Sequence, residues 1–460
     1  MDDLIAALKR AVGRAGYLEG ADISPAYHLD IGGEREGLPR LVLRPANTAE
    51  TSAVLALCSE ARHPVVPQGG MTGLVSAGTP VPGEIVLSLQ RMNAIEALDE
   101  SAATMTVQAG VPLQAVQEAA EARGLFYPLD IGSRGSCTIG GNLATNAGGN
   151  RVIRYGMARD LVLGLEAVLA CGTVVGGMNS MRKNNAGFDL KHLFIGSEGT
   201  LGVITRAVLR LYPRPRSQCV AFCALPGFAS AIALLRMLED SLGGRLSAFE
   251  ALWRNSYRLI LDSVPAVRAP LPDAAPFYVL VEAMGADEQA DQARFEAALG
   301  AALDRALVSE VVLARSVREV RELWAVRDAI SEAALKLKPY LGYDVSMPID
   351  RMETFADRVT REAGRNWPLA RIGLFGHIGD GNVHVVTDVG EDGLTPRSRM
   401  DELVYGATRE VNGSVSAEHG IGLEKKPYLS VSRSENEIAL MRSLKGALDP
   451  KGLLNPGKIF

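Results

Sequence analysis

The chain has 460 residues, of which 47% are apolar and 22% charged, with a formal net charge of −5. This composition is typical of a water-soluble globular protein, and the length predicts two or three domains. The acidic balance argues against a nucleic-acid partner. No run of about 18 apolar residues occurs, so we expect no transmembrane helix.

The sequence also bears on the cellular compartment. Its first residues, MDDLIAALK, include acidic residues and no long apolar run, so we expect no secretory signal. Five scattered cysteines, an odd number, indicate reduced thiols and a cytoplasmic protein, with peripheral membrane contact left open. Because no four-cysteine cluster occurs, we expect no iron–sulfur centre in this chain.

The first half of the chain alternates short strands with helices. Apolar periodicity predicts helices at 4–15, 48–62 and 112–123, the second of them opening on a capping-box-like Asn47-Thr48-Ala49-Glu50. It predicts strands at 40–44, 64–67, 85–89, 104–108, 165–170 and 203–211. The paired prolines of 212–216 are a plausible domain boundary, because they end the last of these strands.

The second half has a different composition, with Ala- and Leu-rich helices predicted between strands. We predict strands at 219–225, 246–250, 277–284, 310–314, 343–347, 371–377 and 383–387. Helices are expected at 227–241, 253–262, 287–304, 316–338 and 398–411. This alternation indicates an α+β domain in which helices cover a sheet.

Glycine, with 48 residues, clusters in a few loops of the first half. Three zones stand out, at 68–80, 128–149 and 196–202, and the second is long enough to be read as a functional loop. Backbone amides can converge on an anion where no Cβ interferes, so these zones predict a ligand with a pyrophosphate and an extended body. Ordinary tight turns are the alternative. No G-x-G-x-x-G or Walker A motif occurs, which disfavours Rossmann and P-loop folds.

Histidines are scarce, with six in the chain, yet His377 and His384 flank one Gly-Asp-Gly-Asn turn. Glu418 and His419 are adjacent further along. Two imidazoles and a carboxylate are a common ligand set for a divalent transition metal. Structural histidines with ordinary hydrogen-bond partners are the alternative interpretation.

The glycine loops carry a family resemblance. The segments PQGGMTG at 67–73, PLD at 128–130, GSCTIGGNLATNAGG at 135–149 and IGSEGTLGVI at 195–204 resemble the FAD-binding domain of the vanillyl-alcohol oxidase / p-cresol methylhydroxylase superfamily. Within it the chain is similar to the FAD-linked D-2-hydroxyacid dehydrogenases, nearest to the D-2-hydroxyglutarate dehydrogenase branch. The match runs from about residue 38 to residue 460.

The resemblance implies an α+β fold with four parts. An N-terminal helical segment (1–37) would precede a two-subdomain FAD-binding domain of the p-cresol methylhydroxylase type (38–215). An α+β substrate, or cap, domain with an antiparallel sheet and the metal site would span 216–420. A C-terminal, partly helical segment (421–460) would return to the flavin.

The resemblance also implies residues that hold FAD. Gly69, Gly70, Thr72 and Gly73 would bind the pyrophosphate. Covalent members use a His or Cys in such loops; no His lies between His63 and His192, and Cys137 occupies an ordinary family position, so we expect non-covalent FAD. The remaining expected FAD contacts are Pro67, Leu74, Pro128, Asp130, Gly135, Ser136, Thr138, Gly140, Gly141, Asn142, Asn146, Gly148, Gly149, Gly199, Gly202, Ile204 and Asn455.

By the same resemblance, the second half carries the chemistry. His377, His384 and Glu418 would bind zinc or manganese, and His419 would be the general base. Arg327, with Ser331 four residues later, would bind the substrate carboxylate. A D-2-hydroxy acid would become a 2-oxo acid, with its hydride passing to flavin N5 and its hydroxyl proton to His419. A metal that acidifies the hydroxyl and an imidazole base suit this reaction.

The substrate is the least defined element of this hypothesis. The hydroxyglutarate branch has a Lys where this chain has Gly342 and an Asn where it has Val386. A 2-hydroxyglutarate-like substrate is favoured, and D-lactate or another more apolar 2-hydroxy acid is the alternative. A metallohydrolase and a dependent subunit of a multi-component oxidation complex are alternatives of other classes. The electron acceptor would be a quinone, an electron-transfer flavoprotein or a partner subunit, and a homodimer is the base-rate expectation.

Overall fold

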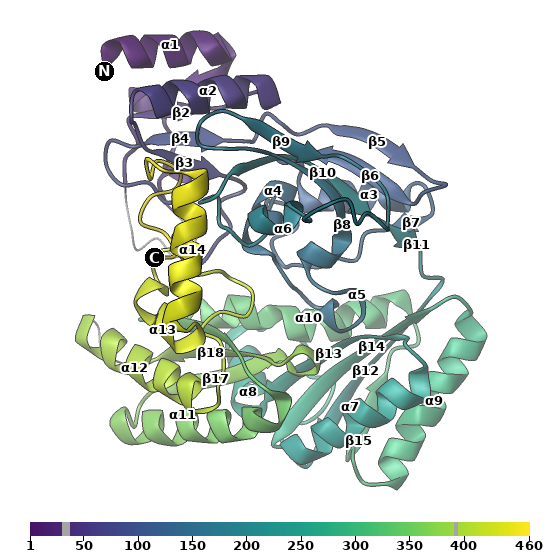
Figure 1. Ribbon diagram of the computed structural model, residues 1–460. Helices are drawn as coiled ribbons and strands as arrows, with labels where there is room; N and C mark the ends of the chain where they lie inside the picture. The colour runs from purple at the N-terminus through teal and green to yellow at the C-terminus, as the bar shows by residue number, and fades with distance from the viewer. Residues whose placement is uncertain (30–36, 391–393) are drawn as a thin grey trace. The chain divides into compact units, whose positions relative to one another are not determined.

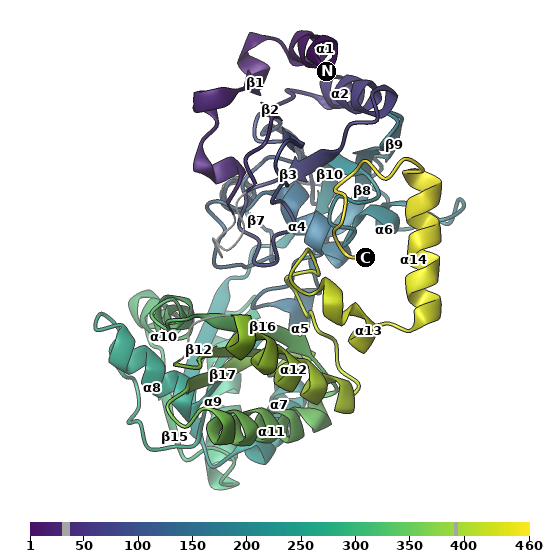
Figure 2. The same cartoon turned by 90° about the vertical axis from the view of Figure 1, so that its left-hand side faces the viewer.

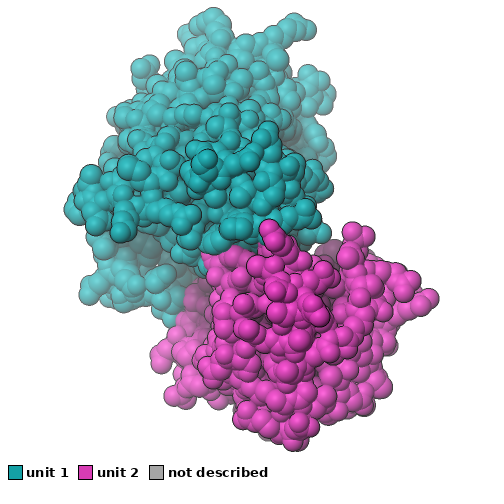
Figure 3. Space-filling model, turned by 90° about the vertical axis from the view of Figure 1, so that its right-hand side faces the viewer, with its two compact units in different colours: residues 1–149, 156–214, 418–460 teal, residues 150–155, 215–417 magenta. Residues whose placement is uncertain are grey.

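A computed structural model of the chain describes residues 1–29, 37–390 and 394–460 (Figure 1). The chain divides into two compact units, coloured separately in Figure 3. Unit 1 comprises residues 1–149, 156–214 and 418–460, and unit 2 comprises residues 150–155 and 215–417. This division differs from the predicted ranges, because 150–155 group with unit 2 and 418–420 with unit 1. Residues 30–36 of the predicted N-terminal segment lie outside the described residues.

The N-terminal part of unit 1 is a mixed sheet with strand order β1-β2-β4-β3. β2 (Leu41–Leu43) and β3 (Val65–Gln68) each pair in parallel with β4 (Ile85–Ser88), and β1 (Tyr17–Leu18) is antiparallel to β2. These parallel strands are buried on both faces, which explains their continuous apolar sequences. Helices α1 (Asp2–Val12) and α2 (Thr48–Glu60) pack together, and the Asn47 side chain caps α2 as predicted.

A second, antiparallel sheet in unit 1 has strand order β5-β6-β10-β8-β9. Its strands are β5 (Ile95–Asp99), β6 (Thr104–Gln108), β8 (Val162–Val168), β9 (Val174–Gly177) and β10 (Val203–Arg210). Helix α3 (Leu113–Glu121) precedes β7 (Leu125–Phe126), which pairs with β11 (Tyr212–Pro213). Short helix α6 (Lys191–Phe194) packs on β8.

The long glycine-rich segment 128–149 is not wholly irregular, contrary to the sequence-based expectation. It contains helix α4 (Ile139–Thr145), which begins where the Thr138 hydroxyl accepts a hydrogen bond from the Gly141 amide. The helix ends at Asn146 in a left-handed conformation. Buried Ile139 and Leu143 hold this helix in place despite two glycines in its first turn.

The C-terminal stretch of unit 1 contains α13 (Leu429–Ser432) and α14 (Glu435–Leu448), seen in yellow in Figure 1. A capping box between Ser434 and Glu437 starts α14. The final turns are tied to the first sheet, since Leu454 bridges Val65 of β3. Lys445 Nζ donates to the carbonyls of Thr200 and Leu454. These bonds hold the C-terminal tail against the rest of unit 1.

Unit 2 is built on an antiparallel sheet with strand order β15-β12-β14-β13-β17-β18-β16, which confirms the predicted α+β fold of this half. The strands are β12 (Ser217–Leu225), β13 (Leu246–Trp253), β14 (Phe277–Gly285), β15 (Glu310–Leu313), β16 (Leu341–Ser346), β17 (Arg371–His377) and β18 (Asn382–Asp388). The helices are α5 (Val152–Tyr155), α7 (Phe228–Leu242), α8 (Arg254–Ser263), α9 (Glu288–Asp304), α10 (Val317–Ala334), α11 (Met352–Asn366) and α12 (Leu394–Glu410).

Helices cover both faces of this sheet (Figure 2). α8 and α10 share one hydrophobic core with Phe222, Leu252, Tyr278 and Leu280 of the sheet. On the opposite face, Phe228 of α7 stacks on Trp253. Helix α10 ends four residues before the predicted end at 338, and α11 was not predicted. Within the described ranges, no helix combines the length and apolarity needed to cross a bilayer.

Candidate active site

Strand register in unit 2 places a row of polar side chains on the sheet face that carries α8 and α10. Residues opposite each other in an antiparallel pair share a face, as do residues two apart on a strand. Glu282 faces Ala248, two residues before Glu250, and Glu250 faces His377. His384 faces both Phe375, two residues before His377, and Asp344. The row therefore crosses β14, β13, β17, β18 and β16.

His377 is held by a carboxylate that the sequence analysis did not identify. Its Nδ1 lies 2.6 Å from Glu250 Oε1, and both side chains are buried. Burial alone would raise the pKa of Glu250, but its interactions with His377 and Arg327, which include a hydrogen bond to each, keep it below its ordinary value. Because an ionised carboxylate only accepts hydrogen bonds, Nδ1 carries the proton, and in the neutral imidazole Nε2 keeps its lone pair. Metal-ligating histidines commonly have this arrangement.

Arg327 reaches the same carboxylate from α10. Its Nε donates to Glu250 Oε2 at 2.7 Å, and its Nη2 lies 3.4 Å from His377 Nε2. The guanidinium also lies over the Phe375 ring, 5.6 Å from its centroid. The predicted substrate-binding cation and a predicted metal ligand therefore meet within unit 2. Ser331, the weaker substrate candidate, is solvent-exposed one turn further along α10.

His384 is fixed by aromatic and polar neighbours. Its ring stacks on Phe375 with centroids 4.8 Å apart, and it meets the His377 ring edge-on at 5.6 Å. Its Nδ1 lies 3.8 Å from the fully buried Asp344 carboxylate. Asp344 also accepts hydrogen bonds from Asn382 Nδ2 and from the amide of Ala417. Two buried imidazoles with adjacent carboxylates make a donor set suited to a divalent metal.

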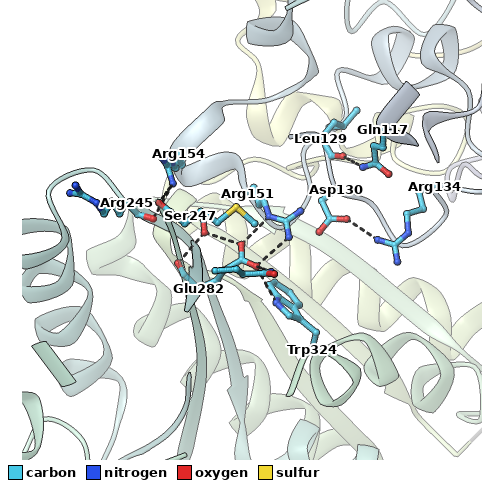
Figure 4. Close-up of polar contacts among 12 residues, drawn as sticks. Gln117, Leu129, Asp130, Arg134, Arg151, Arg154, Arg245, Ser247, Glu282 and Trp324 are labelled. Atoms are coloured by element: carbon cyan, nitrogen blue, oxygen red, sulfur yellow. Dashed lines mark hydrogen bonds and ion pairs between the residues drawn. The ribbon is translucent and has the colours of Figure 1, made fainter. Parts of the chain in front are cut away.

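A second buried carboxylate lies on the next strand (Figure 4). Glu282 accepts hydrogen bonds from Arg151 Nε at 2.9 Å, Trp324 Nε1 at 3.2 Å and Ser247 Oγ at 2.8 Å. Burial would raise the pKa of Glu282, but Arg151 and these donors hold it below its ordinary value. Trp324 and Arg327, three residues apart on α10, thus contact two different carboxylates. Arg151 comes from the segment 150–155, whose place in unit 2 the sequence did not predict.

In unit 1, the structure brings the three glycine-rich zones together. A Cβ on Gly69 would lie 2.7 Å from Thr138 Oγ1, and one on Gly70 would overlap the Ser136 carbonyl. Gly199, at φ +71°, lies against Pro67, where a Cβ would approach to 3.2 Å. The second and third zones therefore both contact the end of β3 or the first zone, which follows it.

Other expected FAD residues lie around this convergence. Gly140 packs against Ala109, and Gly149, at φ +109°, lies against the Asp130 carbonyl. Asn146 Oδ1 accepts from the Arg159 amide. Asn455 Nδ2 donates to the carbonyls of Ala77 and Glu198. Of the remaining expected residues, Gly135, Ser136, Gly73 and Leu74 are exposed, Thr72 is half-buried, and Pro128, Gly148, Gly202 and Ile204 are buried.

The donor atoms near these loops fit a polar, extended cofactor. Among the described residues, Asn142 Nδ2 and Gln68 Oε1 are buried side-chain atoms without a hydrogen-bond partner. Buried polar atoms are nearly always satisfied, so such atoms beside a glycine cradle indicate groups that a ligand would pair. The residues present therefore fit FAD.

Glu418 and His419 begin the C-terminal stretch of unit 1, and both are half-buried. The Glu418 carboxylate accepts a hydrogen bond from the Gly149 amide. A Cβ on Gly148 would also contact this carboxylate, which accounts for that glycine. The roles of Glu418 as a metal ligand and of His419 as a base stay predictions.

Comparison with known proteins identifies the class. Residues 39–176 match the family described as "FAD binding domain", and residues 214–459 match "FAD linked oxidases, C-terminal domain". The fold is that of p-cresol methylhydroxylase, whose solved structure has a TM-score of 0.79 at 15% identity and covers 100% of this chain and 96% of its own. An alkyldihydroxyacetonephosphate synthase structure gives 0.78 at 16% identity, covering 100% and 86%. The chain belongs to the FAD-linked oxidases.

Curated relatives narrow the class. The chain is 39% identical to D-2-hydroxyglutarate dehydrogenase of Arabidopsis thaliana over 98% of this chain and 80% of the relative. It is 40% identical to the Bos taurus enzyme of that name, over 100% and 84%. A putative D-lactate dehydrogenase of Schizosaccharomyces pombe is 37% identical, over 98% and 88%. The chain is an FAD-linked oxidoreductase, and this sets aside the metallohydrolase interpretation.

Proposed function

We propose that the chain oxidises a D-2-hydroxy acid to the 2-oxo acid by a metal-assisted reaction beside His377 and Arg327 in unit 2. The observation that carries this proposal is the arrangement of His377, Glu250 and Arg327. The Nδ1 of buried His377 bonds to the Glu250 carboxylate, and its Nε2 faces the Arg327 guanidinium. This arrangement offers a metal ligand next to a cation that can bind a carboxylate. Both are needed to hold a 2-hydroxy acid by its hydroxyl and carboxyl groups.

Each predicted residue has one task in this scheme. Arg327 binds the substrate carboxylate, and its fork suits the two carboxylate oxygens. His377, His384 and Glu418 would hold a zinc or manganese ion, which lowers the pKa of a bound hydroxyl. His419 takes the hydroxyl proton, a role suited to imidazole near neutral pH. FAD, held non-covalently by the glycine loops, supplies the hydride acceptor N5.

We propose a 2-hydroxyglutarate-like acid as the first substrate candidate, because relatives at about 40% identity carry that name. A more apolar acid such as D-lactate is the second candidate. It is favoured by Val386, which is buried in the apolar core beneath α8 and α10, on the same face as His384. Gly342, opposite Val386, supplies no cation for a distal carboxylate.

The electron acceptor and the setting of the enzyme are part of the same proposal. The two electrons taken from the substrate would pass to a quinone, an electron-transfer flavoprotein or a partner subunit, and the accompanying proton would be released. Dye-linked turnover by the isolated chain would argue against dependence on a partner subunit. Several relatives are named as mitochondrial proteins, and a cytoplasmic location and a homodimer remain predictions for this chain.

Anaerobic reduction of the bound flavin tests the reaction class. The flavin absorbance should bleach with D-2-hydroxy acids and not with L-isomers. Chelator treatment should abolish bleaching, and added zinc or manganese should restore it. Bleaching that survives complete metal removal would eliminate the metal's role, and no bleaching by any 2-hydroxy acid would eliminate the proposed reaction.

Replacement of the predicted base tests its role separately. His419→Ala should keep the flavin spectrum and lose about 10²–10⁴-fold in the rate of flavin reduction, the usual contribution of a general base. The rate is measured by stopped-flow absorbance under saturating substrate. Reduction at the wild-type rate would remove His419 from the base role.

A further inference from the structure

Glu250 occupies an unusual position in the sheet of unit 2. Its strand, LSAFEALW over 246–253, is otherwise apolar apart from Ser247, and its side chain is 1% exposed. Each carboxylate oxygen has its own partner, since Oε1 binds His377 Nδ1 and Oε2 binds Arg327 Nε. An ionised carboxylate is buried only when such partners compensate it.

We propose that Glu250 is a positioning residue that couples the predicted metal ligand His377 to the predicted substrate-binding Arg327. This inference rests on the proposed function and deepens it. Glu250 touches neither the metal nor the substrate in this scheme. It sets the tautomer of one side chain and the orientation of the other.

The two hydrogen bonds act on different properties. The bond to Nδ1 fixes the proton there, so Nε2 keeps the lone pair that a metal needs, and the carboxylate makes the imidazole a stronger ligand. The bond to Nε fixes the plane of the guanidinium, whose Nη2 then lies 3.4 Å from His377 Nε2. A planar donor fork held in one orientation loses less entropy when it binds a carboxylate.

The isosteric change Glu250→Gln separates these effects, because Gln has one acceptor oxygen and one donor nitrogen. If the Gln oxygen keeps the hydrogen bond from His377 Nδ1, the Gln amide nitrogen faces the Arg327 N–H. Two donors then meet, the bond that orients Arg327 is lost, and the substrate KM rises. If the amide reverses, its nitrogen donates to Nδ1 and forces the proton onto Nε2, and metal affinity falls. Either orientation therefore weakens at least one function.

Glu282 offers a matched control. It is equally buried, lies on the neighbouring strand and binds an arginine, Arg151, yet its hydrogen bonds involve neither predicted metal ligand nor Arg327. Glu282→Gln should lower thermal stability as Glu250→Gln does. It should leave metal affinity and KM within about twofold of wild type.

The experiment uses the FAD-loaded full chain, stripped with chelator and titrated with zinc or manganese against a competing dye. Zinc should bind about 10–100-fold more weakly to Glu250→Ala, the usual cost of losing such a partner of a metal ligand. Glu250→Gln should show that loss or a comparable rise in KM. Glu250→Asp, which keeps the charge, should fall between wild type and Glu250→Ala, and it serves if the neutral variants do not fold.

A spectroscopic readout separates positioning from general destabilisation. The chain has six histidines, so ¹⁵N-histidine labelling gives few signals. Metal-free wild type should show the His377 imidazole protonated at Nδ1, and this signal should change in Glu250→Gln and persist in Glu282→Gln. Wild-type metal affinity and KM in Glu250→Ala, or an equal loss of both in Glu282→Gln, would overturn the inference. If wild type itself binds no metal, the metal site of the proposed function fails instead.

Discussion

At the scale of single residues, the surroundings of Gly342 determine what a substitution there can do. Gly342 is opposite Val386 and lies two residues from Asp344 on the same face. A Cβ at Gly342 would overlap the Tyr340 hydroxyl. Gly342→Lys alone should therefore displace Tyr340 and give little gain with D-2-hydroxyglutarate. Combined with Tyr340→Ala, it should raise kcat/KM for this acid about tenfold or more, the value of one charge-assisted hydrogen bond.

The comparison needs a substrate without a distal carboxylate. D-lactate should show no such gain in the double variant, because it has no group for the new lysine. Adding Val386→Asn should increase the preference for D-2-hydroxyglutarate further. An equal gain in Gly342→Lys alone would show that Tyr340 does not limit this position. An equal gain with D-lactate would show that the new lysine does not act on the distal carboxylate.

The residues of the site differed in how readily the sequence alone could predict them. His377 and His384 could be found because two rare residues flank one turn. Glu250 could not, because its partners lie 77 and 127 residues away and only sheet register brings them together. An acid inside the apolar run 246–253 was the available signal. Arg327 entered through family resemblance, since an arginine on a helix is usually solvated.

At the scale of elements, the glycine loops of unit 1 depend on close backbone approach. Gly70→Ala would push a methyl group into the Ser136 carbonyl, so the loop after β3 and the loop before α4 must separate. We expect a loss of about 1–3 kcal/mol in stability, the typical cost of overpacking, together with reduced FAD content. FAD absorbance per chain and thermal unfolding measure both.

Gly132 is the control within the same long segment. It is exposed, and a Cβ there would meet nothing within 4 Å. Gly132→Ala should keep FAD content and melting temperature close to wild type. Similar losses in both variants would mean that general loop stiffness, and not contact between the two loops, controls FAD binding.

Several elements show what a single sequence can and cannot provide. Helix α11 was missed but could have been predicted from the sequence. Its buried residues repeat at helical spacing, namely Met352, Phe355, Ala356 and Val359. Helix α4 was not, because its seven residues include two glycines and depend on the Thr138 cap and on burial of Ile139 and Leu143. Local propensity opposes α4, and tertiary contacts decide in its favour.

At the scale of the whole molecule, the chain does not divide at simple sequence boundaries. The C-terminal return to the flavin-binding part was expected from family resemblance. The grouping of 150–155 with unit 2 was not, because it depends on long-range contacts. Arg151 binds Glu282, and Arg154 donates to the carbonyls of Arg245 and Met284. Such contacts, 91 to 131 residues apart, leave no local pattern.

The two units should respond in opposite ways to acid. In unit 2, the folded pKa of Glu282 lies below its ordinary value. Its contribution to stability is full above the unfolded value, about 4.3, and is lost as pH falls through the lower folded value. In unit 1, burial raises the pKa of Glu198, although the amides of Ile421 and Gly422 donate to it. The contribution of Glu198 to stability is full below its unfolded pKa, and it is lost as pH rises through its raised folded pKa.

Acidification from pH 7 toward pH 3.5 should therefore weaken unit 2 before unit 1. Hydrogen exchange read by mass spectrometry should show protection factors falling first in β12, β13 and β14, while β3 and β4 keep theirs. Glu282→Gln should lower the stability of unit 2 at pH 7 and flatten its acid response, because the titrating group is gone. Earlier loss of protection in unit 1, or an unchanged acid response in Glu282→Gln, would mean that other carboxylates control acid unfolding.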